Sequence, residues 1–150
     1  MRVQRETFTP ELFVEMIGVV QEHNDEICAV HGDLNPYLEV YFLLEGQGLL
    51  DTITARTDED EVIGYYICMT SIHHHHADLL VGSQMALYVK KDFRGQGVSG
   101  KLLSKAEEVL TERGATSIVV AIPAGKDHSK AFDKLGYKPM EHSYYKNLGD

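Results

Sequence analysis

One segment constrains the fold of this chain more than any other: residues 88–103, with the sequence YVKKDFRGQGVSGKLL. Tyr88 and Val89 end an apolar run, glycines recur in the loop that follows, and Leu102 and Leu103 begin an amphipathic stretch. This order predicts a strand, a tight loop and then a helix. The first N–H groups of a helix have no partner inside the helix and lie at its positive end, where they bind anions. The segment therefore predicts a loop that holds a phosphate group.

Length and charge narrow the class of protein. The chain has 150 residues and a formal net charge of -9. The length fits one domain around a single core, and the negative charge disfavours nucleic-acid binding, which requires clustered Lys and Arg. Cys28 and Cys68 lack metal-ligand spacing, so we expect buried free thiols in a reducing compartment. No apolar run approaches the ~20 residues that span a bilayer, and no signal-peptide region is present, so we expect a cytoplasmic protein outside the membrane.

Helix and strand signals alternate along the chain without repeats or linkers, so we expect residues 1–150 to form one domain of mixed α/β class. An amphipathic helix is predicted from about residue 10 to 23, where Thr9 is a suitable N-cap and Pro10 occupies the first helical position. A short apolar run at 117–122 predicts a strand buried on both faces. The other predicted elements are a helix at 37–45, a hairpin of strands 49–55 and 62–69, a strand at 79–89, a helix that starts near residue 100 and ends at Gly114, a helix at about 127–135, and two final strands at 137–139 and 143–148.

Two classes of phosphate-binding loop compete for the central motif. Residues 95–101 (GQGVSGK) satisfy the first part of the nucleotide P-loop pattern, which is Gly, four residues and Gly-Lys. That pattern next requires a Ser or Thr to bind Mg²⁺, and this chain has Leu102. Residues 90–94 also separate the predicted strand from the loop, and the next buried strand runs into Pro123 rather than into an acidic metal ligand. The P-loop is therefore the weaker interpretation.

The other class is the pyrophosphate loop of the GNAT superfamily of N-acetyltransferases, which the same segment resembles. The family pattern is Gln or Arg, two residues, Gly, one residue, and then Gly or Ala, after a strand that ends in Val. Arg94, Gly97 and Ser99 occupy these positions, so the chain departs from the pattern at the small residue Ser99. The resemblance extends from about residue 62 to 137, and residues 134–137 (KLGY) are similar to the Lys-Leu-Gly-Phe ending of the family.

The resemblance implies a GNAT-like fold, with a mixed, mostly antiparallel sheet of six to seven strands splayed in a V and about four flanking helices. It also implies an N-acetyltransferase without a metal ion, in which a primary amine of a small molecule or protein attacks acetyl-CoA directly in a ternary complex. Loop N–H groups would bind the pyrophosphate, and the strand before the loop would pair with the pantetheine arm and polarise the thioester carbonyl. The implied coenzyme-binding residues are Leu87, Tyr88, Val89, Arg94, Gly95, Gln96, Gly97, Val98, Ser99, Gly100 and Phe132.

Two positions where the family often carries catalytic groups hold other residues here. Phe132 stands where a tyrosine commonly protonates the leaving thiolate, and residues 84–86 (QMA) replace a common carboxylate base. His75, in the run of four histidines at 73–76, is a candidate proton acceptor because imidazole exchanges protons near neutral pH. A solvated turn and, less favoured, a metal site are the alternatives for that run. Tyr145 is a candidate acid, with packing in a final strand as its alternative.

The acceptor side is less defined by the sequence. Tyr37 and Tyr41 fall on the predicted second helix, where enzymes of this family commonly line the acceptor pocket, and packing is an equal alternative. Because the usual tyrosine and carboxylate are missing, a second class of function stays open: an acyl-CoA binding module with little or no turnover, acting as a sensor or scaffold. The expected partners are acetyl-CoA and an amine, and an exposed final strand would offer an edge for a homodimer.

Overall fold

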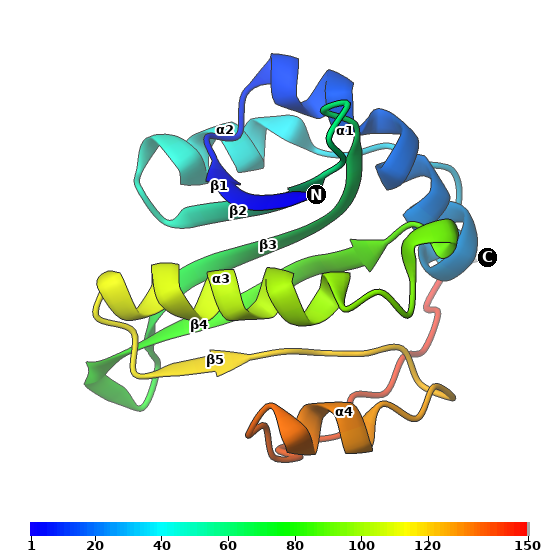
Figure 1. The fold of residues 1–150 in the computed structure, drawn as a ribbon. Helices are drawn as coiled ribbons and strands as arrows, with labels where there is room; N and C mark the ends of the chain where they lie inside the picture. Colours follow the sequence, from blue (N-terminus) through cyan, green and yellow to red (C-terminus); the bar gives the residue numbers. More distant parts are fainter. Residues whose placement is uncertain (150) are drawn as a thin grey trace.

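The computed structural model describes residues 1–149 and is built on one mixed β-sheet (Figure 1). Its five strands are arranged across the sheet in the order β1-β2-β3-β4-β5. Neighbouring strands from β1 to β4 are antiparallel, whereas β5 runs parallel to β4. The strands are β1 (Arg2–Glu6), β2 (Leu50–Arg56), β3 (Val62–His73), β4 (His76–Val89) and β5 (Ser117–Val119).

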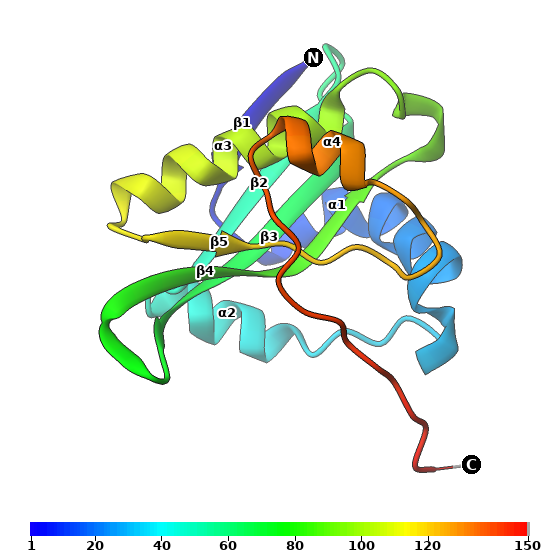
Figure 2. The same ribbon diagram turned by 90° about the horizontal axis from the view of Figure 1, so that it is seen from below.

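Helices cover both faces of the sheet (Figures 1 and 2). On one face lie α1 (Pro10–His23) and α2 (Leu38–Gly46), and on the other lie α3 (Val98–Glu112) and α4 (Ser129–Lys134). Three short turns connect these elements. The π-helical turn η1 (Asn24–Cys28) continues α1 and is followed by the 3₁₀ turn η2 (Ala29–His31), and the 3₁₀ turn η3 (Lys91–Phe93) follows β4.

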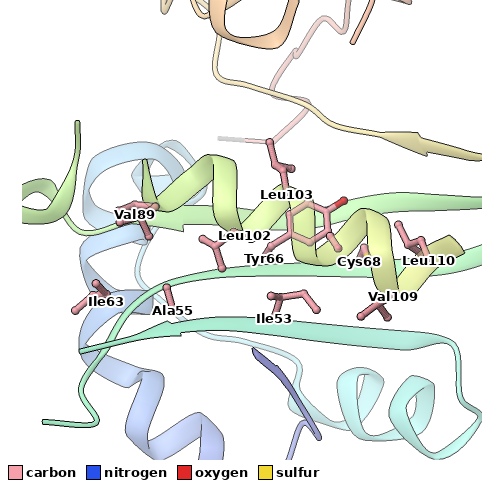
Figure 3. Packing of buried hydrophobic residues seen from close by; sticks show 12 residues of the cluster. Ile53, Ala55, Ile63, Tyr66, Cys68, Val89, Leu102, Leu103, Val109 and Leu110 are labelled. Atoms are coloured by element: carbon pink, nitrogen blue, oxygen red, sulfur yellow. The ribbon is translucent and has the colours of Figure 1, made fainter. Parts of the chain in front are cut away.

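The amphipathic patterns explain how each helix packs. Thr9 caps α1, because its hydroxyl accepts a hydrogen bond from the N–H of Leu12 at 3.1 Å, and Pro10 follows at the first helical position. The apolar side of α3 lies on β2, β3 and β4, as Figure 3 shows for Leu102, Leu103 and Leu110. A second core fills the space between the sheet and α1 and α2. Its buried residues are Phe8, Leu12, Met16, Val19, Leu50, Val62, Tyr65, Ile67 and Tyr88.

The mixed α/β class is confirmed, but the expected number of strands is wrong: the sheet has five strands rather than six to seven. Residues 137–149 contain no strand. This segment follows α4, is almost fully exposed, and pairs with no strand of the described chain (Figure 2). The expectation that 117–122 is buried on both faces is also wrong. Its regular part is short, lies at the sheet edge and contains no fully buried residue. The sequence reading also missed β1, whose polar residues carry no strong strand signal.

The most important feature of the sheet for function is the divergence of β4 and β5. These strands pair only from Val81 to Ser83, and beyond that point the two segments run apart (Figure 2). Gln84 lies at the junction, where its Nε2 donates a hydrogen bond to the carbonyl of Ala121 at 2.9 Å. From residue 85 to 89, the edge of β4 on this side has no strand partner within the described residues. The opening leads directly to the glycine loop.

Candidate active site

A cavity of about 370 Å³ lies where β4, the glycine loop and the start of α3 meet. Gly95 and Gly97 have φ angles of 77° and 76°, which residues with a side chain rarely adopt, and they turn the chain into α3. Lys101 donates to the carbonyl of Gly97 at 3.1 Å, so the N–H groups of residues 98–100 precede the hydrogen-bonded part of the helix. We call this space the donor cavity. Of the predicted coenzyme-binding residues, those that line it are Leu87, Tyr88, Val89, Arg94, Gly95, Val98, Ser99, Gly100 and Phe132, while Gln96 and Gly97 belong to the same loop without lining it.

The unpaired edge of β4 presents backbone groups to the donor cavity. Lys90, which follows β4, donates a hydrogen bond to the carbonyl of Ile63 on β3 at 2.9 Å. Alternate residues of an antiparallel pair face the partner strand, so the backbone groups of Tyr88 also face β3. By the same alternation, Leu87 and Val89 direct their N–H groups into the opening between β4 and β5. An extended ligand could therefore pair with β4 as an additional strand would.

Arg94 ties the glycine loop to two other elements. Its Nε donates to the carbonyl of Val89 at 3.0 Å, and its two terminal nitrogens donate to the carboxylate of Glu26 on η1 at 2.9 and 2.7 Å. The same carboxylate accepts hydrogen bonds from Tyr88 Oη at 2.5 Å and from Lys126 Nζ at 3.0 Å. These bonds, first among them the one from Arg94, hold the pKa of Glu26 well below its usual range. A single carboxylate on η1 thus pairs with both cations, Arg94 and Lys126, beside the loop.

A second cavity, of about 540 Å³, lies on the opposite face of the sheet between α1, residues 28–38 and β4. We call it the acceptor-side cavity. Met85 and Ala86 of β4 line it, and the next three residues of the strand line the donor cavity. The two cavities therefore meet along one short stretch of a single strand. Most of the other lining groups are apolar or aromatic: Phe8, Phe13, Met16, Val20, Leu34, Leu38, Tyr41, Tyr65 and Ile67.

His23 contributes a titratable group to the acceptor-side cavity. It is the last residue of α1, and its Nδ1 lies 2.6 Å from the hydroxyl oxygen of Tyr65 on β3. Its ring stacks on that of Tyr88 on β4, with centroids 4.7 Å apart and an interplanar angle of 12°. Burial lowers the pKa of His23, while the nearby charge of Glu26 partly opposes that shift. A neutral imidazole is therefore held against β3 and β4 at the cavity wall.

His75, the predicted proton acceptor, lies at the tip of the β3–β4 hairpin, at the opposite end of β4 from the glycine loop (Figure 1). At ~3.3 Å per residue, the 14 residues of β4 place this tip roughly 40 Å from Val89. Its N–H bonds to Nδ1 of His73 at 3.1 Å, and its side chain is exposed. The structure does not bring His75 into either cavity.

The other predicted residues fall at several different places. Tyr41 lines the acceptor-side cavity and stacks on Phe8 with ring centroids 5.0 Å apart, whereas Tyr37 is exposed and is not part of the lining. Tyr145 lies in the exposed C-terminal segment, and its ring meets that of His31 edge-on at 5.2 Å. Phe132 packs edge-on against a neighbouring tyrosine ring at the wall of the donor cavity. Neither predicted catalytic residue is next to the unpaired edge of β4.

Sequence reasoning missed His23, Glu26 and Tyr65. His23 could have been found, because it continues the core-facing spacing of Met16 and Val19 at the end of the predicted helix. Tyr65 falls in the predicted strand 62–69, and only the fold shows which helix it faces. Glu26 lies in a π-helical turn for which the sequence carries no distinct signal.

Comparisons with known proteins bear on this arrangement of glycine loop and open strand edge. A family model described as an acetyltransferase (GNAT) domain matches residues 50–139. The chain belongs to the GNAT acetyltransferase family. The resemblance of the loop sequence to this family is thereby confirmed. The matched range holds β2 to α4, and it therefore contains most of the donor cavity but not α1, η1 or α2.

Curated GNAT relatives match part of the chain. One is N-alpha-acetyltransferase 30 of Schizosaccharomyces pombe, 33% identical over 97 residues, which are 62% of this chain and 63% of that protein. Another is an uncharacterised N-acetyltransferase of Chlorobaculum tepidum, 35% identical over 60 residues, or 40% of this chain and 36% of that protein. The alignments thus span less than two thirds of the length of either relative.

Solved structures show the same fold over nearly the whole chain. An aminoglycoside acetyltransferase from an uncultured soil metagenomic sample, in complex with sisomicin, has a TM-score of 0.76 at 15% identity and covers 99% of this chain and 96% of its own. A ribosomal-protein-alanine N-acetyltransferase from Brucella melitensis has a TM-score of 0.72 at 17% identity and covers 99% and 100%. At these identities the similarity establishes the GNAT fold alone.

Within residues 1–149, no group of three or more His, Cys, Asp or Glu side chains is arranged to hold a metal ion. No helix in this range is long and apolar enough to cross a bilayer.

Proposed function

We propose that the protein is an N-acetyltransferase that moves the acetyl group of acetyl-CoA to a primary amine by direct attack. The observation that carries the proposal is the unpaired edge of β4, which opens into the same cavity as the N–H groups at the start of α3. The loop N–H groups would bind the pyrophosphate at the positive end of the helix. The pantetheine arm would extend along residues 87–89.

The N–H group of Leu87 would supply the electrostatic part of catalysis. It lies on the unpaired side of β4, next to the point where the two cavities meet. A backbone donor at this position would stabilise the negative charge that develops on the thioester oxygen during attack, and it would need no reorganisation. Holding amine and thioester on one strand would also remove much of the entropic cost of their encounter.

The acceptor amine would bind in the acceptor-side cavity. Apolar and aromatic side chains make up about half of the lining, and contact with them disfavours a charged ammonium relative to the neutral amine that the reaction requires. Because the similar proteins carry names that refer to α-amino groups and to aminoglycosides, both classes belong in a test panel. The panel also includes a lysine-containing peptide and a simple aryl-alkyl amine, phenethylamine.

The first test incubates the protein with acetyl-CoA and each amine of the panel and follows release of free thiol from pH 5 to 9. Thiol release that depends on the amine, together with detection of the acetylated amine by mass spectrometry, is expected. Tight acetyl-CoA binding with no amine-dependent thiol would contradict the proposal and favour an acyl-CoA binding module without turnover.

A substitution tests the placement of the donor. Gly97→Glu introduces negative charge into the loop whose N–H groups would bind the pyrophosphate, and it strains a backbone with a φ of 76°. We expect acetyl-CoA affinity, measured by calorimetry, to fall at least about 100-fold. Gly114→Glu is the matched control, since Gly114 has a φ of 84° at the other end of α3. If Gly97→Glu bound acetyl-CoA as tightly as Gly114→Glu does, the placement of the donor would be wrong.

A further inference from the structure

The side chain of His23 has one ring nitrogen fixed and one free. Nδ1 lies 2.6 Å from Tyr65 Oη, whereas no hydrogen-bond partner for Nε2 is found among residues 1–149. The ring lines the acceptor-side cavity and is stacked on Tyr88, which also lines the donor cavity. Tyr65 and Tyr88 face each other across β3 and β4, so His23 is held by two positions of the sheet at once. No part of the proposed donor site uses this imidazole.

We propose that His23 is the proton acceptor for the acceptor amine and that Tyr65 is the positioning residue that orients it. The proposed role uses the tautomer in which Nδ1–H donates to Tyr65 Oη, 2.6 Å away, because that tautomer leaves the lone pair of Nε2 free to take a proton. The inference rests on the proposed function, because it assigns a role within the same reaction. It replaces His75, which lies at the far end of β4, as the histidine that acts on the amine.

The charges around His23 determine its protonation state. Burial lowers its pKa from the ordinary value near 6.5, and the carboxylate of Glu26 on η1 raises it, with a net decrease. The imidazole is therefore neutral at pH 7, as a proton acceptor must be. Burial raises the pKa of Tyr65, so its hydroxyl stays protonated. The titratable or charged groups that face His23 or share its cavity are Glu22 and Glu26 beside Tyr88, Tyr65 on β3, Tyr88 on β4, Tyr41 on α2, Cys28 on η1, His31 on η2 and Asp33 in the connection to α2.

The proton balance of the step is complete with these groups. The amine nitrogen forms a bond to the acetyl carbon, and the carbon–sulfur bond breaks with its electron pair leaving on sulfur. One N–H proton passes to Nε2 of His23, and the thiolate of coenzyme A takes a proton from water. The imidazolium then returns its proton to the solvent. The net products are an acetamide and free coenzyme A.

The test compares the pH profiles of wild type, His23→Gln and the smaller variant His23→Asn with the panel amine that is acetylated fastest. For wild type, log kcat/KM should rise with a slope of 1 in the range where the amine loses its proton, and with a slope of 2 at the acidic end, where His23 must also lose one. Both variants should keep a slope of 1 throughout. A general base contributes about 10²–10⁴-fold to rate, so kcat should fall at least about 100-fold.

Control measurements distinguish the loss of the proton acceptor in the His23 variants from damage to their fold. The acetyl-CoA Kd of both His23 variants should stay within about twofold of wild type, and His142→Gln, at an exposed position in the C-terminal segment, should have the wild-type profile. Tyr65→Phe should reduce kcat less than His23→Gln does, because it removes only the oxygen that orients the ring. Identical pH profiles and kcat in wild type and both His23 variants would overturn the inference while leaving the proposed function intact. Absence of amine-dependent thiol release in wild type would instead overturn the proposed function.

Discussion

At the scale of single residues, Glu26 carries the densest set of interactions in the site. Its carboxylate is bonded to Arg94, Tyr88 and Lys126, and its side chain is 15% exposed. The pKa of a carboxyl held by such partners falls. A carboxyl whose pKa is lower in the folded state than in the unfolded state stabilises the folded state when it is ionised. Because the folded-state pKa of Glu26 lies below the unfolded value of 4.5, its contribution to stability is complete above about pH 4.5. It is lost as the pH falls below that value.

Glu26→Gln tests this contribution. Because Arg94 and Lys126 are each about 40% exposed, solvent screens the ion pairs, and we expect the variant to be less stable than wild type at pH 7 by roughly 1 kcal/mol. The difference should shrink between pH 4.5 and 3.5, where the unfolded-state carboxyl takes up a proton. Urea denaturation at pH 7, 4.5 and 3.5 measures it, with the exposed Glu141→Gln as control. An equal difference at all three pH values would show that these bonds are not ionic in origin.

At the scale of secondary-structure elements, close packing of α3 on the sheet fixes where β4 and β5 begin to separate. Gly82 of β4 is paired with Ile118 of β5, and a Cβ atom on Gly82 would lie 2.5 Å from Leu110 Cδ1 on α3. Glycine is therefore required for the helix to approach the junction of the two strands. The unpaired edge of β4 begins three residues later, at Met85.

Gly82→Ala should force Leu110 out of its position and destabilise the protein by about 1–3 kcal/mol, the usual cost of overfilling a packed core. Gly18→Ala is the matched control, because a Cβ on Gly18 meets no atom within 4 Å and the residue lies inside α1. That control should instead stabilise the protein by up to ~1 kcal/mol, since alanine favours the helix. Thermal unfolding of both variants measures the expected loss of stability in Gly82→Ala and the expected gain in Gly18→Ala. Equal changes in stability in the two variants would show that Leu110 can move to accommodate the added Cβ without destabilising the protein.

At the scale of the whole molecule, Tyr137 is the last of the described residues that is not exposed. The ring of Tyr137 packs against Phe132, and its hydroxyl donates to Glu107 on α3 at 2.6 Å. The described residues after it, 138–149, are exposed, and their one aromatic contact is that of Tyr145 with His31. This segment leads away from the sheet in Figure 2.

Truncation after Tyr137 should therefore cost at most about 1 kcal/mol, the scale of one edge-on aromatic contact, and leave the acetyl-CoA Kd within about twofold. Truncation after Leu135, which also removes the Tyr137 ring, should destabilise the protein further and weaken acetyl-CoA binding, because Phe132 at the donor cavity loses its packing partner. Differential scanning calorimetry and calorimetric titration check both effects. A large loss in the longer variant would mean that residues after 137 form a stabilising structure.

The sequence predicted the helices and strands that have local signals. It did not predict the features that depend on contacts between segments far apart in the chain. The 10–23 helix, the hairpin, the strand before the loop and the α3 helix follow from caps, periodicity and glycine positions, and all are present in the structure. Strand β1 was missed because its charged side chains pair with β2 at a sheet edge, where a strand needs no apolar pattern. The proton exchange of imidazole near neutral pH makes His75 a candidate, but the sequence alone does not show which end of a hairpin faces a site.

The division of the two cavities between segments of the chain has a consequence for divergence among related proteins. The wall of the donor cavity comes mostly from β4, α3 and α4, within the range that the family model matches. The wall of the acceptor-side cavity comes largely from α1, η1, η2 and the residues before α2, outside that range. Among them, residues 29–37 contain no buried side chain, and changes in such connecting segments generally cost little folding stability. Related proteins could therefore come to accept different amines while the residues that bind the acetyl donor stay the same.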